Sequence, residues 1–147
     1  MLDKRYYEKG VGEEKGVEGG ADFVLDPLLQ ERSAEGCDIG SELNVLEEEF
    51  PSLDFSSLPD AWTSKEGAYA VDDEAVESRA RTVREGLRER VAKLEKDQGE
   101  RRDVVVVTHG VFMKFLSGDK GIDLPKAGWK TFEIGEDEKG RVVLVPI

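Results

Sequence analysis

The sequence predicts an α/β domain in which helices pack on a parallel β-sheet. Three consecutive segments support this: a long amphipathic helix over 72–97, the run Val104–Val107, and a short apolar helix over 111–116. An uninterrupted valine run is typical of a strand covered on both faces. The order helix, strand, helix along the chain is the usual crossover arrangement of α/β layer folds.

Length and charge set the first limits on function. The chain has 147 residues, the size of one domain, and 21 basic against 33 acidic residues give a net charge of −12. Nucleic acids and anionic membranes are disfavoured as partners, because both bind basic surfaces.

No apolar stretch approaches the roughly 18 residues of a membrane span, and the first nine residues lack the apolar core of a signal peptide. One cysteine and one histidine exclude a disulfide framework and a Cys/His zinc site, so we expect a cytoplasmic protein.

Residues 1–20 interleave glycine with charge and show little apolar periodicity. Such a stretch buries too little surface to offset the entropy of ordering it. We therefore expect a disordered or low-complexity leader over 1–20, with a regulatory tail as the alternative, and an incomplete α/β domain over 21–147.

The segment after the leader mixes short elements and loops. Phe23–Leu25 predicts a strand that leaves the sheet at Asp26–Pro27. Ser41 is the expected N-cap of a short helix that ends before Pro51. Residues 51–70 predict a long loop anchored by aromatic side chains.

The helix over 72–97 is the clearest element. Acidic residues fill its first turns and lysines its last, as the helix dipole favours, and Gly99 is the expected stop. Its apolar residues recur every three or four positions: Val76, Ala80, Val83, Leu87, Val91 and Leu94. We interpret the arginines at 79, 81, 84, 88 and 90 as its solvated face, with a patch for an anionic ligand as the alternative.

Thr108-His109-Gly110 lies between the valine strand and the helix over 111–116, which should end near Gly118. Ligands in open α/β sheets bind at the carboxyl ends of strands, and the free N–H groups of a helix amino end favour an anion. Gly110 would allow close backbone approach, and His109 adds a donor. The alternative is a His109 ring that caps the helix or bonds a neighbouring loop. Beyond this segment, 131–134 and 141–145 predict a hairpin around a polar loop.

Four segments together resemble the histidine phosphatase superfamily, in particular the fungal branch of phosphoglycerate-mutase-like proteins. They are VVVVTHGVFMKFL (Val104–Leu116), LLQE (Leu28–Glu31), CDIG (Cys37–Gly40) and FPSLDFSSL (Phe50–Leu58), and their order and spacing agree over about residues 23–118. The resemblance implies a three-layer α/β/α phosphoglycerate-mutase-like sheet. It also implies phosphomonoester hydrolysis or phosphoryl transfer through a phosphohistidine, without a metal or other cofactor.

The resemblance assigns roles to three residues. Glu31 would be the general acid, His109 the second, phosphate-contacting histidine, and Gly110 part of the phosphate-binding backbone. The implied substrate is a phosphorylated small molecule or a phosphoprotein. Two alternatives stay open from the residues themselves: Glu31 as a surface carboxylate, and Cys37 as a substitute nucleophile, for which we expect a structural thiol instead.

The chain departs from the family pattern because it holds no Arg-His-Gly motif, no second histidine and no counterpart of the segment with the second arginine. We therefore expect an N-terminally truncated fold without activity, since removing the attacking group abolishes the covalent route. A non-catalytic acidic α/β module that binds a partner or an anion, and an incomplete gene model of an active phosphatase, remain as alternative hypotheses.

A missing strand would also leave Val104–Val107 with an unpaired edge. Such an apolar edge is a template for pairing with another chain. We expect marginal stability and dimerisation or aggregation through this edge, unless residues 23–25 cover it.

Overall fold

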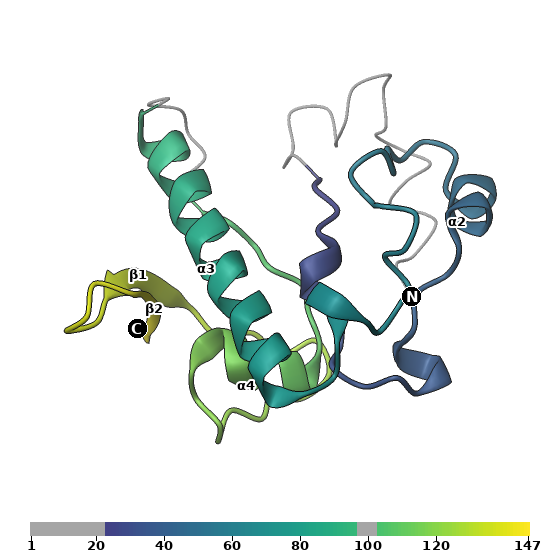
Figure 1. Cartoon of the computed structure of the whole chain (residues 1–147). Helices are drawn as coiled ribbons and strands as arrows, with labels where there is room; N and C mark the ends of the chain where they lie inside the picture. Colours follow the sequence, from purple (N-terminus) through teal and green to yellow (C-terminus); the bar gives the residue numbers. More distant parts are fainter. Residues whose placement is uncertain (1–22, 97–102) are drawn as a thin grey trace. The chain divides into compact units, whose positions relative to one another are not determined.

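The structure, a computed structural model, describes residues 23–96 and 103–147 (Figure 1). The expected leader over 1–20 and the expected stop at Gly99 lie outside the described residues. The described residues form two compact units, one of 23–27 and 40–63, the other of 28–39, 64–96 and 103–147. The described elements are α2 (Leu43–Glu49), α3 (Asp73–Lys96), α4 (Gly110–Ser117), β1 (Phe132–Glu136) and β2 (Val142–Pro146), with 3-10 turns at Pro27–Leu29, Gly36–Asp38 and Gly67–Tyr69.

The mixed helix and strand content of the predicted class is confirmed, although the sheet described consists of the antiparallel pair β1 and β2. In the described part of the chain, no helix combines the length and apolar character needed to cross a membrane.

Helix α3 confirms the predicted long helix almost to the residue. Its amino end is capped by Asp72, whose carboxylate accepts the backbone N–H of Ala75 at 3.0 Å. Acidic residues occupy the first turn and lysines the last, so the charges match the helix dipole. Helix α4 also agrees with its prediction and ends at Gly118, which adopts the left-handed conformation with φ of 72°.

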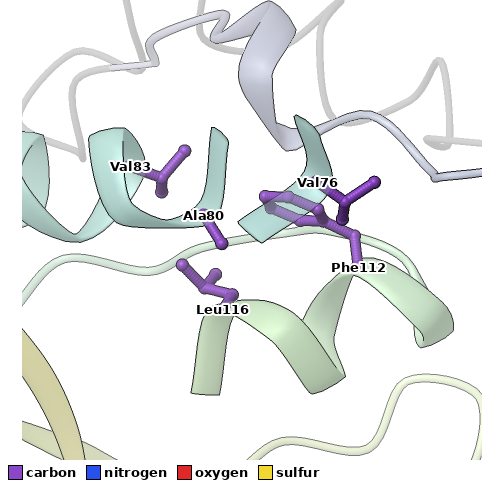
Figure 2. Packing of buried hydrophobic residues seen from close by; sticks show 5 residues of the cluster. All are labelled: Val76, Ala80, Val83, Phe112 and Leu116. Carbon is purple, nitrogen blue, oxygen red and sulfur yellow. The ribbon is translucent and has the colours of Figure 1, made fainter. Parts of the chain in front are cut away.

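The core lies between α3 and α4. Figure 2 shows side chains of α3 pointing toward those of α4, and all five residues drawn are buried: Val76, Ala80, Val83, Phe112 and Leu116. Each fully buried side chain of the larger kind stabilises the fold by roughly 1.5 to 3 kcal/mol. Strand β2 contacts both helices, so the hairpin extends this core.

The prediction that Val104–Val107 forms a strand covered on both faces is wrong. The segment is extended, but Val105 and Val107 are 84% and 81% exposed, while Val106 packs against the core. Within the described residues its backbone makes no hydrogen bond to another segment. A valine run shows that a segment favours extended backbone, but a strand exists only where a neighbouring strand pairs with it.

The unit with α2 differs from its prediction at two places. Helix α2 begins after Glu42 and not after Ser41, and its N-cap makes no side-chain hydrogen bond. The Glu42 carboxylate instead accepts the Thr63 hydroxyl at 3.4 Å. Phe23–Leu25 forms no strand, and Leu25 accepts a hydrogen bond from the Ser57 hydroxyl through its carbonyl.

The aromatic loop over 51–70 is confirmed as a run of turns with one 3-10 turn. Phe55 and Leu58 are buried in it. The Trp62 ring lies so close to Gly40 that a Cβ at this glycine would overlap the ring. Gly40 therefore provides the space for the indole.

The predicted hairpin is present, with β1 one residue longer than the expected strand and β2 of the expected length but shifted by one residue. In the antiparallel register Ile134 lies opposite Leu144, and the pairing runs on into the polar segment that the sequence assigned to the loop. The remaining turn is organised by Asp137, whose carboxylate accepts the backbone N–H groups of Lys139 and Arg141 and the Arg141 side chain. Gly140 adopts φ of 73° at the end of this turn, which favours glycine.

Candidate functional site at the amino end of helix α4

Glu31 is the centre of the candidate site. It directly follows the turn Pro27–Leu29 and Gln30, and only 8% of it is exposed. Its Oε2 accepts the backbone N–H of Val111 at 3.0 Å, and its Oε1 accepts that of Phe112 at 3.0 Å. Oε1 also accepts the N–H of Arg32 at 2.7 Å. The alternative of a surface carboxylate is therefore wrong.

These hydrogen bonds make Glu31 the capping group of α4. A helix leaves its first four N–H groups without an internal partner, and a negative charge is favourable at that end. Glu31 supplies both the acceptor and the charge, from a position 80 residues before Val111. Hydrogen bonds from N–H groups to an ionised carboxylate are also stronger than neutral ones.

His109 occupies the N-cap position of α4 by sequence, with extended backbone at φ −117° and ψ 161°. Its side chain makes no capping hydrogen bond and is exposed. The alternative in which the His109 ring caps the helix is therefore wrong, because Glu31 takes that role. The preceding Thr108 hydroxyl donates to the Leu29 carbonyl at 2.7 Å and ties this segment to the residues before Glu31.

Gly110, the first residue of α4, is exposed and faces open space. A Cβ at this position would meet no atom within 4 Å, and the backbone is not left-handed. The fold itself therefore does not require glycine here. The space that the missing side chain leaves is open to a ligand.

Arg79 corrects the prediction that the arginines of the long helix form its solvated face. It is 2% exposed, and its guanidinium carbon lies 4.5 Å from the centre of the Phe112 ring. None of its side-chain nitrogens has a hydrogen-bond partner among the described residues. Burial lowers the pKa of Arg79 from its usual value, while the charge of Glu31 acts in the opposite direction.

The helical spacing of Arg79 explains its burial. It lies three residues after Val76 and four before Val83, so it shares their face of α3. That spacing is visible in the sequence and could have separated Arg79 from the exposed arginines of the same helix: Arg81, Arg88 and Arg90.

Arg84 is the second arginine that the sequence analysis misplaced, and it binds the other end of α4. Only 8% exposed, it donates from Nη1 to the carbonyls of Phe115 at 2.8 Å and Leu116 at 3.2 Å. Its Nη2 forms an ion pair with Glu77 at 2.8 Å. Helix α4 thus has an anion at its amino end and a cation at its carboxyl end, as its dipole favours.

Lys65 adds a second cation near Glu31. Its Nζ donates to the side-chain oxygen of Gln30 at 2.8 Å and to the backbone carbonyl of Glu31 at 2.9 Å. Burial, and next the charge of Arg79, lower the pKa of Lys65. Lys65 lies in the loop before the 3-10 turn Gly67–Tyr69, where no sequence pattern marks it.

Cys37 lies in the 3-10 turn Gly36–Asp38, at the surface. The thiol is exposed, so it is not the structural thiol of a core, and its hydrogen-bond partner is the Asp38 carboxylate at 3.6 Å. Over 23–96 and 103–147, no group of three or more His, Cys, Asp or Glu side chains is placed to hold a metal ion.

The structure thus brings Glu31, His109 and Gly110 to one helix end, Glu31 buried and the other two exposed. Two cavities of the described residues lie elsewhere, one lined by Arg84, Gly118 and Leu144, the other by Val91, Ala92 and Ile134. In comparisons with known proteins, no family model, no curated protein and no solved structure matches this chain.

Proposed function

We propose that this chain is a histidine-phosphatase-like protein that binds a phosphomonoester at the amino end of α4 without turning it over. The phosphoglycerate-mutase-like three-layer arrangement is the proposed parent fold. The observation that carries the proposal is that Glu31 and His109, distant in sequence, meet at one helix end beside the open space at Gly110. Helix amino ends favour phosphate, and a protonated imidazole adds positive charge.

The absence of turnover follows from the groups at this site. His109 is the only histidine of the chain, and the family route needs a second one as the nucleophile. Both oxygens of Glu31 accept backbone N–H groups, so in this structure the carboxylate caps α4. Phosphoryl transfer through a phosphohistidine needs the attacking histidine of the family's Arg-His-Gly motif, and the sequence holds no such motif.

Two assays test this proposal on the purified chain. With p-nitrophenyl phosphate we expect no hydrolysis above the buffer rate and no acid-labile phosphoenzyme. Because the chain has a single histidine, its imidazole proton resonances are assigned without ambiguity, and adding phosphate should shift them.

Two outcomes would contradict the proposal. A phosphoenzyme that forms in the natural sequence and disappears in His109→Ala would show that His109 is a nucleophile. If the imidazole resonances do not shift even at the highest phosphate concentration, the chain does not bind phosphate at His109, and the proposed binding function is wrong.

The second proposed function is self-association through Val104–Val107. The specific observation behind it is the pair of highly exposed valines, Val105 and Val107, on a segment whose backbone pairs with no other described strand. Unpaired extended backbone readily adds a strand from another chain. The proposed compartment is the cytoplasm, in line with a single cysteine that is free.

A further inference from the structure

We infer that Glu31 is an internal competitor for the phosphate site: its carboxylate occupies the oxyanion position at the amino end of α4, and a phosphate binds by displacing it and pairing with Arg79. This inference rests on the proposed function and adds the regulation of the same site. It also adds Arg79, which the resemblance does not assign.

The first argument is the donor geometry. The backbone N–H groups of Val111 and Phe112 are the donors that a helix amino end offers to a phosphate. In this structure each donates to one oxygen of Glu31 at 3.0 Å. A phosphate cannot use these two donors while the carboxylate holds them, so binding requires Glu31 to leave.

The second argument is the unused guanidinium of Arg79. It is almost completely buried, it stacks on Phe112 in the first turn of α4, and none of its nitrogens is hydrogen-bonded to a described residue. Buried polar groups without a partner are rare, and a bound anion is one of the partners that would satisfy such a group. Glu31 is close enough to act on the charge of Arg79, but its oxygens accept hydrogen bonds elsewhere.

These two arguments together select the chemical class of the ligand. A carboxylate has two oxygens, and in Glu31 both are engaged with backbone N–H groups. A phosphate has additional oxygens that can reach a guanidinium while two others accept the helix amides. A carboxylate ligand in the place of Glu31 would use both of its oxygens on these two N–H groups and would have none left for Arg79. The site therefore fits a phosphate group better than a carboxylate.

The experiment titrates inorganic phosphate into the full chain and follows the backbone amide resonances of Val111 and Phe112. Glu31→Gln keeps the shape and removes the charge, and Glu31→Ala also removes the volume. We expect both variants to bind phosphate about tenfold more tightly than the natural sequence, since each frees donors from a charge-assisted hydrogen bond. Glu35→Gln is the matched control, because Glu35 is exposed and its loss changes the net charge equally.

The role of Arg79 is tested in the same titration. Arg79→Met retains an apolar chain against Phe112, and combined with Glu31→Gln it should abolish the gain in affinity. In the natural sequence, saturating phosphate should also shift the side-chain carboxyl carbon resonance of Glu31, because the carboxylate leaves its N–H donors. This measurement does not depend on the folding of any variant.

The outcomes separate this inference from the proposed function. Equal affinity in the natural sequence and Glu31→Gln, or amide shifts without a shift of the Glu31 carboxyl carbon, would overturn the inference and leave phosphate binding intact. Binding by the variants alone would support the inference and overturn phosphate binding by the natural sequence. Binding by none of them would overturn both.

Discussion

The Glu31 carboxylate accepts the backbone N–H of Phe112 at 3.0 Å, although 81 positions separate the two residues. The Phe112 ring is completely buried against α3 and carries the Arg79 guanidinium on its face. The first turn of α4 is therefore fixed by an anion at its backbone and by the core at its side chain. A substitution of Glu31 should therefore weaken the packing between α3 and α4.

Removal of the Arg84 guanidinium should destabilise the fold. In Arg84→Met the carbonyls of Phe115 and Leu116 lose their charged donor and Glu77 loses its ion-pair partner. We expect the free energy of unfolding to fall by about 1.5 to 3 kcal/mol, the usual range for hydrogen bonds to a charged group. Urea denaturation followed by circular dichroism measures the change.

Arg81→Met is the matched control for this experiment, because Arg81 is exposed on the same helix. Its effect should stay within about 0.5 kcal/mol, as for most surface substitutions. Equal losses in the two variants would show that Arg84 does not hold the carboxyl end of α4.

Val105→Lys should reduce self-association of the chain. Val105 is 84% exposed on the unpaired segment, and a lysine at a strand edge opposes pairing with another chain. Sedimentation velocity should show dimers or larger species for the natural sequence, increasing with salt, which screens the repulsion between copies of net charge −12. Val45→Lys makes the same change on α2 and should leave association unchanged.

A monodisperse monomer with a sharp melting transition at high temperature would contradict this prediction. It would mean that the chain is stable without a neighbouring strand at Val104–Val107. If Val105→Lys and Val45→Lys change the proportion of monomer and dimer equally, association does not occur through this segment.

Asp137 should contribute an acid-dependent part of the stability. The Arg141 side chain, and then its backbone N–H, lower the pKa of Asp137 from 3.8 to about 2. Because the folded-state pKa lies below the unfolded one, the contribution is present above pH 3.8 and is lost as the pH falls toward 2. The stability difference between the natural sequence and Asp137→Asn should therefore shrink over this window.

The measurement is a series of urea denaturations of the natural sequence and of Asp137→Asn, from pH 5 down to about pH 2. A difference that remains constant with pH would show that the Arg141 contacts do not act on the Asp137 charge.

Local patterns predicted the helices and the hairpin because each of these elements is determined by residues close in sequence. The apolar spacing of α3, the glycine that follows α4 at Gly118 and the polar turn between the hairpin strands are all local signals. The valine run failed as a predictor because pairing depends on a second strand, which the run itself does not encode.

The candidate site was predictable only in part. A motif comparison selected Glu31 and His109, but nothing near Glu31 in the sequence indicates that its carboxylate caps a helix 80 residues later. Arg79 was missed because five arginines on one helix suggest a solvated face, although its spacing from Val76 and Val83 places it with the core. Lys65 acquires its contacts through loop conformation, which no periodicity describes.

The most direct test of the account measures hydrogen exchange at the Val111 and Phe112 amides in the natural sequence and in Glu31→Gln, without phosphate. If Glu31 is the capping anion of α4, both amides exchange faster in the variant, and the free energy of unfolding falls by about 1 to 3 kcal/mol. Glu35→Gln should change neither quantity. Unchanged exchange at both amides, together with unchanged stability in Glu31→Gln, would contradict the account.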